Sequence, residues 1–222
     1  MPLEISVRKR KVKKRLQNKS QGGLSMKKTL IGLHLILFLF LPLSLYAGVP
    51  LTTVEQHVNK VLNVLRDPAL KGESAKKVKQ EKLRAISEEM FDFAELSKRT
   101  LGNNWKNFNP DQQKEFIELF KDILEDAYMD RITSYRDEKI VFIKEFMLSD
   151  DKAEVQSNII TKKSETPIYY RVILKTGEWK VYDVIIEGVS LIKNYRSQFR
   201  EILANKSPEA LLKVLRKKVG KA

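Results

Sequence analysis

The spacing of the apolar residues changes twice along this chain, and these two changes limit the folds that the chain can adopt. Apolar residues recur every three to four positions up to about residue 135, alternate from 140 to 186, and return to the helical spacing from about 190. The expected helices cover 51–66, 74–86, 88–101, 110–135, 190–202 and 208–219, and the expected strands cover 140–148, 153–159, 168–174 and 179–186. The pattern therefore predicts an α+β fold, with a four-stranded antiparallel sheet packed on helices.

Two short motifs mark boundaries within this pattern. Asn109-Pro110-Asp111-Gln112 has an N-cap residue, a proline at the first helical position and a glutamine at the capping-box position, which predicts the start of the longest helix. Lys175-Thr176-Gly177-Glu178 separates two alternating runs and predicts a tight hairpin turn.

The N-terminal end has the composition of an export signal. Residues 26–47 consist of Met26-Lys27-Lys28, an apolar run and a small residue, Ala47, at the expected cleavage position. An uncleaved membrane anchor is the alternative, but the apolar run is shorter than the about 20 residues that a spanning helix requires. We expect a secretory signal peptide that is cleaved after Ala47, leaving a mature domain of residues 48–222.

Residues 1–25 precede this signal and do not fit it. Gly22-Gly23 lie just before Met26, and their codons would give the purine-rich DNA of a bacterial ribosome-binding site. We interpret residues 1–25 as an over-extended start, with translation beginning at Met26. The alternative is a disordered basic arm that binds nucleic acid or directs the chain to the nucleus.

The charge of the chain is concentrated at this end. The formal net charge is +14, of which residues 1–28 account for +9. The remaining body is only weakly basic, so we expect no nucleic-acid partner. The chain has no cysteine, which excludes thiol catalysis, thiolate metal sites and disulfides.

Few residues of the body suggest catalysis. After signal removal His57 is the one remaining histidine, and Gly188-Val189-Ser190 lacks the second glycine of a nucleophile elbow. We expect Gly188 to make a turn and Ser190 to cap the following helix. One histidine and no cysteine leave only scattered carboxylates, so we expect no metal site.

Asp183 stands out because it lies among apolar residues of an expected strand. A carboxylate that faces an apolar cavity could act as a general base with a raised pKa. Alternatively, Asp183 is bonded to backbone N–H groups or to Arg196 or Arg200, and holds the corner between strand and helix. We favour the structural corner, formed by Asp183, Gly188, Ser190 and Arg196.

Several motifs resemble those of a known family. They include Phe91-Asp92-Phe93, Leu101-Gly102 and Trp105, the 179–184 run WKVYDV, the 187–191 run EGVSL and the 195–199 run YRSQF. Together they are similar to the MlaC family of periplasmic phospholipid-shuttle proteins, also called toluene-tolerance proteins. The resemblance covers about residues 50 to 218, and the 181–199 run carries most of its specificity.

The resemblance implies a fold and a role. The fold would be a curved sheet and long helix of the NTF2-like kind, with an added helical subdomain. The protein would be a monomeric periplasmic carrier with no cofactor, whose cargo is a phospholipid. Its partners would be an inner-membrane ABC transporter with an MCE-domain ring and an outer-membrane lipoprotein–porin complex, and its role would be to maintain outer-membrane lipid asymmetry.

The apolar surface of the long helix and the strands is either a thick core or the lining of a lipid pocket. In the second case we expect the tails to contact Phe116, Phe120, Leu124, Tyr128, Tyr135, Val155, Val172, Leu174, Val184, Ile186 and Val189. A shift of one residue along the last strand would replace Val184 and Ile186 by Val181 and Ile185. Two other functions stay open: an NTF2-like enzyme that uses Asp183 as general base on a small apolar substrate, and a membrane-tethered interaction protein.

Overall fold

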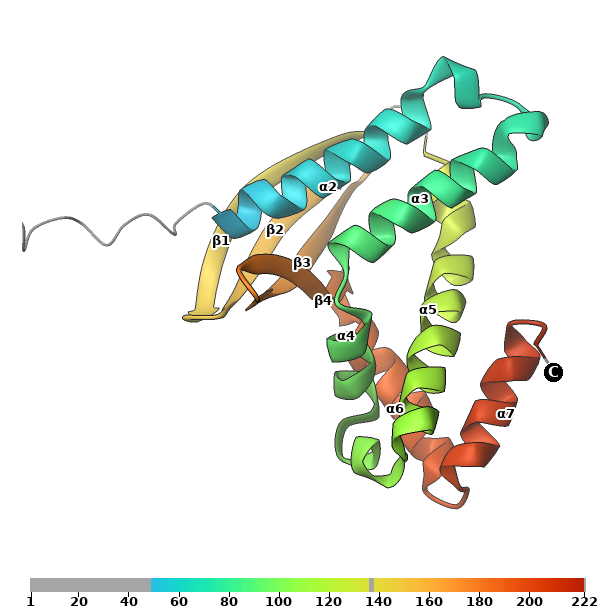
Figure 1. Cartoon of the computed structure of the whole chain (residues 1–222). Helices are drawn as coiled ribbons and strands as arrows, with labels where there is room; N and C mark the ends of the chain where they lie inside the picture. Colours follow the sequence, from blue (N-terminus) through green and yellow to red (C-terminus); the bar gives the residue numbers. More distant parts are fainter. Residues whose placement is uncertain (1–48, 136–137, 222) are drawn as a thin grey trace, which may run out of the picture. The chain divides into compact units, whose positions relative to one another are not determined.

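The order of helices and strands follows the predicted change of apolar spacing in the computed structural model, which describes residues 49–135 and 138–221 (Figure 1). The α-helices are α2 (Val49–Arg66), α3 (Lys76–Met90), α4 (Phe93–Leu101), α5 (Pro110–Thr133), α6 (Leu191–Leu203) and α7 (Pro208–Lys218); short 3-10 turns are η1 (Pro68–Leu70), η2 (Glu73–Ala75) and η3 (Gly102–Asn107). The strands are β1 (Lys139–Ser149), β2 (Lys152–Ile160), β3 (Glu165–Lys175), β4 (Glu178–Ile186) and β5 (Val189–Ser190). The expected signal peptide and the residues before it lie outside the described residues.

The predicted start of the longest helix is confirmed. The Asn109 side chain accepts a hydrogen bond from the Gln112 N–H at 2.9 Å, and the Gln112 side chain accepts one from the Asn109 N–H at 3.2 Å. The boundary between α3 and α4 differs from the prediction, because α3 continues to Met90. The Asp92 N–H then donates to the Val181 carbonyl, and its side chain caps α4.

The sheet has five strands rather than the predicted four, in the order β1-β2-β3-β4-β5, and all neighbouring strands are antiparallel. The fifth strand forms because the chain turns back at Glu187-Gly188, where φ is +50° and +81°. Two successive residues with positive φ are typical of the hairpin turns that match strand twist, and glycine adopts this conformation at no steric cost. The predicted turn at Thr176-Gly177 has the same form, with φ values of +50° and +84°.

The apolar residues form two clusters. The first, here called the helical layer, joins α4, α5, α6 and α7 to two residues of the sheet, and it contains Leu96, Leu101, Phe108, Phe116, Leu119, Phe120, Ile123, Leu124, Ile173, Tyr182, Ile192, Tyr195, Phe199, Leu211, Leu212 and Leu215. The second, here called the α2 layer, contains Val54, Val58, Leu62, Met90, Ala153, Val155, Tyr170, Val172, Trp179, Val181, Val184 and Leu191. Figure 1 shows α2 running along one face of the curved sheet.

A bulge in β4 decides which of its side chains face α2. Arg171 pairs with Asp183 but the next residue, Val172, pairs with Val181, so Tyr182 is an extra residue with no partner on β3. An extra residue inverts the alternation of the strand. Val181 and Val184 therefore both belong to the α2 layer, although they are three residues apart, while Tyr182 belongs to the helical layer.

Candidate functional site

The α2 layer is the apolar surface most suited to hold a ligand, because the apolar stripe of α2 packs along the sheet there. Val54, Val58 and Leu62 of α2 lie one helical turn apart and are 1–8% exposed. They belong to one apolar cluster with residues of the sheet, of which Val155, Val172 and Val181 are at most 1% exposed. The two apolar faces meet directly, so any guest between them must displace α2 from the sheet or deform the sheet.

Among the contacts that link α2 to the rest of the fold are three polar ones. The Leu51 N–H donates to Glu145 Oε2 at 2.8 Å, and Lys60 Nζ lies 2.5 Å from Glu89 Oε2 at the end of α3. At the other end of α2, Arg66 donates to the Tyr135 hydroxyl at 2.6 Å. Ion pairs between exposed side chains contribute little to stability, about 0–1 kcal/mol, so we attribute the attachment of α2 mainly to its apolar stripe.

A polar pair, Ser157 of β2 and Tyr170 of β3, lies beside the apolar residues of the α2 layer. Ser157 is fully buried and donates to the Ile168 carbonyl at 2.9 Å. Burial raises the pKa of Tyr170 to about 12, although a hydrogen bond with Ser157 opposes this shift. A buried hydroxyl that stays protonated is a fixed polar group on an otherwise apolar face. Neither residue was singled out from the sequence, because a serine and a tyrosine fit an alternating strand without any special signal.

The structure separates the predicted lining residues into groups. Val155, Val172 and Val184 are in the α2 layer, and Tyr128, Tyr135, Leu174 and Ile186 are partly buried against it. Phe116, Phe120 and Leu124 lie in the helical layer instead. Val189 is 57% exposed on β5, since the unpredicted fifth strand turns it away from the core.

The aromatic residues of α5 explain this division. Phe120 contacts Tyr195 and Phe199 of α6 with ring centroids 5.0 and 5.3 Å apart, and Phe116 contacts Phe199 at 5.6 Å. Tyr128, two turns further along α5, packs against both layers. Phe116 and Phe120 of α5 thus pack in the helical layer, and α5 approaches the α2 layer only further along, at Tyr128.

The predicted corner after β4 is a hydrogen-bonded unit. Asp183 is 2% exposed, and its Oδ2 accepts a hydrogen bond from Ser190 Oγ at 2.7 Å while its Oδ1 accepts one from the Ile192 N–H at 3.1 Å. Ser190 Oγ in turn accepts from the Lys193 N–H at 3.1 Å and caps α6 as predicted. A carboxylate at a helix N-terminus is stabilised by the helix dipole.

Arg196 does not take the predicted part in this corner. Its Nε and Nη2 donate to the Arg99 carbonyl at 3.0 and 2.5 Å. This contact joins α6 to the last turn of α4, where carbonyl groups lack helical partners. The prediction that Arg196 braces Asp183 is therefore wrong, because the Arg196 guanidinium is bound to the Arg99 carbonyl instead.

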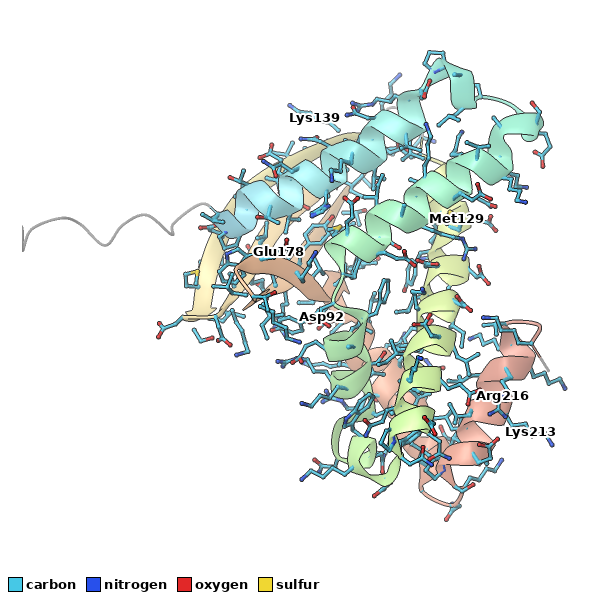
Figure 2. All side chains as sticks on the ribbon, in the orientation of Figure 1. Asp92, Met129, Lys139, Glu178, Lys213 and Arg216 are labelled. Atoms are coloured by element: carbon cyan, nitrogen blue, oxygen red, sulfur yellow. The ribbon has the colours of Figure 1, made fainter. Side chains whose placement is uncertain are left out.

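Two hollows in the described part of the chain adjoin the apolar layers. One, of about 510 Å³, is lined by Asp111, Lys114, Glu115, Glu118, Leu119, Arg216 and Lys221. Arg216, labelled in Figure 2, lies on α7 and holds it to α5 through Glu115 at 2.6 Å. The other, of about 420 Å³, is lined by Val49, Thr53, His57, Glu89, Gly177, Glu178, Trp179 and Lys180.

Residues 49–135 and 138–221 contain no group of three or more histidine, aspartate or glutamate side chains that could hold a metal ion. Within the same residues, none of the helices combines the length and the apolar character needed to cross a membrane.

Comparison with known proteins identifies the family. The family model described as MlaC protein matches residues 55–217, which is most of the chain. The chain belongs to the MlaC family. The resemblance seen in the sequence motifs is thereby confirmed, and the match runs from within α2 to within α7.

Two known proteins show how far the similarity extends. The intermembrane phospholipid transport system binding protein MlaC of Haemophilus influenzae is 29% identical over 119 residues, which cover 51% of this chain and 56% of that protein. The match therefore spans about half the length of this curated relative. A phospholipid-binding protein from Ralstonia solanacearum, solved in complex with a phospholipid, has a TM-score of 0.69 at 23% identity and covers 78% of this chain and 98% of its own. This likeness confirms the α+β fold with its antiparallel sheet.

Proposed function

We propose that this MlaC-family chain is a phospholipid carrier of the periplasm, with the acyl tails held between α2 and the sheet. The observation that carries the proposal is the α2 layer, a continuous apolar cluster between α2 and the sheet. The curated relative is named as a phospholipid transport binding protein, and the structural relative was solved with a phospholipid. Both support the same class of ligand for this chain.

The energetics explain why such a carrier is needed. Each CH₂ group exposed to water costs about 0.8 kcal/mol, so two acyl chains resist leaving a bilayer by on the order of 20 kcal/mol. A carrier has only to offer an apolar site about as favourable as the bilayer. Tails that enter the α2 layer would replace the contacts of Val58 and Leu62 with the sheet, so one apolar contact is exchanged for another.

The geometry around Asp183 favours the carrier over the enzyme considered from the sequence. Both oxygens of the carboxylate accept hydrogen bonds from the corner itself. The carboxylate is also only 2% exposed, whereas a general base must lie within hydrogen-bond reach of the proton that it takes from the substrate. The relatives are described as phospholipid-binding or transport proteins, which agrees with a non-catalytic role.

Location and partners are part of the same proposal. Residues 26–47 would direct export and be removed after Ala47, so that the mature chain begins at Gly48. As a monomer, it would exchange lipid with an inner-membrane MCE-domain ABC transporter and an outer-membrane lipoprotein–porin complex, and so maintain lipid asymmetry. The edge strand β1 supports such docking, because Ile143, Phe146, Met147 and Leu148 are 42–52% exposed. Exposed apolar groups of this kind mark contact sites.

The test is to express the chain in a bacterial host, purify it without detergent, and identify the bound lipid by solvent extraction and mass spectrometry. We expect about one phospholipid per protein and an N-terminus at Gly48. Val58→Asp should lower the bound lipid, because it places a carboxylate in the α2 layer. Val58→Thr, which keeps the shape and adds one hydroxyl, should lower it less.

Val78→Asp is the matched control, since Val78 is a helical valine that is 45% exposed on α3. It should leave the bound lipid unchanged. An empty wild-type protein that is folded by circular dichroism would refute the carrier proposal. Equal lipid in the Val58 and Val78 variants would show that the tails lie elsewhere.

A further inference from the structure

The hollow of about 420 Å³ adjoins the α2 layer through one residue. Trp179 lines the hollow and is also a member of the α2 layer. The other walls are the first half of α2, the end of α3 and the turn between β3 and β4, where Glu178 is labelled in Figure 2. Its volume falls in the range of small-molecule sites, about 300–1,000 Å³.

Two ring nitrogens at this place have no hydrogen-bond partner among the described residues. They are Nε1 of Trp179, a residue only 5% exposed, and Nδ1 of His57. The indole N–H can only donate, and buried donors in proteins nearly always have an acceptor. Trp179 Nε1 therefore needs an acceptor that the described residues do not supply. A phosphate or ester oxygen of a ligand in the hollow would provide it once α2 shifts slightly.

The hollow is lined by charged groups of both signs. Lys180 Nζ lies 3.0 Å from Glu178 Oε2 and donates to the Glu89 carbonyl at 2.7 Å. The Glu89 carboxylate pairs with Lys60, whose hydrogen bond holds the pKa of Glu89 below its usual value. Two carboxylates, Glu89 and Glu178, and one ammonium group, Lys180, thus line the same small volume. A ligand with both charges can pair with both kinds of group, whereas a purely anionic ligand meets the carboxylates as well.

We propose that this hollow is the headgroup subsite of the carrier and that it takes a zwitterionic phosphodiester with a primary ammonium group. The phosphate would accept from the Trp179 N–H and from Lys180, and the ammonium group would pair with Glu89 and Glu178. The inference rests on the proposed carrier function. Trp179 gives it geometric support, since a lipid with tails in the α2 layer would place its headgroup beside this residue.

The chain should be expressed in a host whose membrane contains both ethanolamine and glycerol headgroups, and the ratio of the two should be measured in the protein-bound lipid and in the membrane. The ratio on the protein should exceed that of the membrane by about three- to fivefold, the size expected from partly exposed ion pairs. The double variant Glu89→Gln/Glu178→Gln should return the ratio to the membrane value. An unchanged ratio in this folded, lipid-loaded variant would overturn the subsite.

Glu118→Gln is the matched control. Glu118 is an exposed carboxylate 3.2 Å from Lys121 and lines the other hollow. It should leave the headgroup ratio unchanged. Trp179→Phe keeps an aromatic ring in the α2 layer but removes the N–H together with the pyrrole part of the indole, so it should lower the enrichment while the tails still bind. A fall in enrichment for Glu118→Gln as large as for the double variant would also overturn the subsite.

The same phosphate and ammonium chemistry occurs in water-soluble phosphodiesters, and a second titration separates the two sources. Glycerophosphoethanolamine is added to protein stripped of lipid, with Trp105→Phe as background so that the fluorescence reports Trp179. If glycerophosphoethanolamine binds weakly and the wild-type protein carries lipid in its extract, the subsite takes a lipid headgroup. Tight binding with no lipid in the extract would overturn the carrier function. If the protein carries lipid but shows no headgroup enrichment, the headgroup subsite is overturned and the carrier function is not.

Discussion

Ser190 Oγ donates a hydrogen bond of 2.7 Å to Oδ2 of Asp183, and the same oxygen atom of Ser190 accepts from the Lys193 N–H at 3.1 Å. One hydroxyl therefore connects a buried carboxylate of β4 to the first turn of α6. The carboxylate is 2% exposed and depends on these donors. This relationship explains why an acidic residue occurs within an apolar strand.

The first prediction concerns this carboxylate. Asp183→Asn removes the charge that the α6 N-terminus and Ser190 stabilise, and hydrogen bonds to charged groups contribute about 1.5–3 kcal/mol. We expect the melting temperature to fall by about 3–12 °C, at 2–4 °C per kcal/mol for a domain of this size. Thermal unfolding followed by circular dichroism measures it.

Asp150→Asn is the control, since Asp150 is exposed in the turn between β1 and β2. It should change stability by less than about 0.5 kcal/mol. If Asp183→Asn proved as stable as the wild type, the structural corner would be the wrong interpretation, and the general-base hypothesis would return.

The second prediction concerns the movement of α2. The chain has no cysteine, so Lys60→Cys/Glu89→Cys can be cross-linked selectively with a short bismaleimide and will tie α2 to the end of α3. Because Phe91 pairs with Val181 just beyond α3, this link also ties α2 to the sheet. Lipid loading should slow by more than about tenfold if it requires a state with α2 displaced.

The matched control is Lys121→Cys/Glu88→Cys, an ion pair of 2.9 Å between α5 and α3 that does not involve α2. Cross-linking this pair should leave the loading rate as in the wild type. Uptake of fluorescent phospholipid from vesicles provides the measurement. Equal loading with and without the Lys60–Glu89 link would show that the lipid enters without moving α2.

The third prediction is a pH dependence from His57. Burial, together with the nearby Lys60 and Lys180 ammonium groups, lowers the pKa of His57 below 6.5, while Glu89 and Glu178 oppose the shift. The unfolded chain then binds the proton more readily than the folded chain. Stability is complete above about pH 6.5 and falls as the pH drops from there towards the folded pKa.

His57→Gln should remove this part of the pH dependence, and the comparison with wild type subtracts the contribution of the carboxylates. Urea midpoints measured between about pH 5 and 8 report it. If the urea midpoint of His57→Gln changed with pH as much as that of the wild type, the pH dependence would come from other groups.

The fourth prediction separates the two layers. Phe120 is 1% exposed in the helical layer, so Phe120→Leu should cost about 1–3 kcal/mol of stability but leave the lipid bound per folded molecule unchanged. Val172→Ala, in the α2 layer, should lower both stability and bound lipid. Native mass spectrometry beside chemical unfolding compares them. Loss of lipid in Phe120→Leu would place the tails beside α5, as the sequence alone suggested.

The sequence determined those features that depend on near neighbours along the chain. The capping box at Asn109 and Gln112, the turn at Thr176-Gly177 and the Ser190 cap are all local, because each hydrogen bond or φ value involves residues at most three positions apart. The order of helices and strands follows from the same local periodicity. The family motifs are specific enough that the order of the amino acids alone indicates the MlaC family.

The tertiary structure decided what depends on distant residues. The extra residue Tyr182 appears only when β4 pairs with β3, and it sets which valines face α2. Arg196 donates to the Arg99 carbonyl, 97 residues away in sequence. No local pattern could therefore have shown that Arg196 does not bind Asp183. The apolar stripe of α5 is equally apolar along its length, and only the position of α6 assigns Phe116 and Phe120 to the helical layer. The spacing of apolar residues indicates that a side chain is buried, whereas the residues that it packs against depend on the packing of the whole chain.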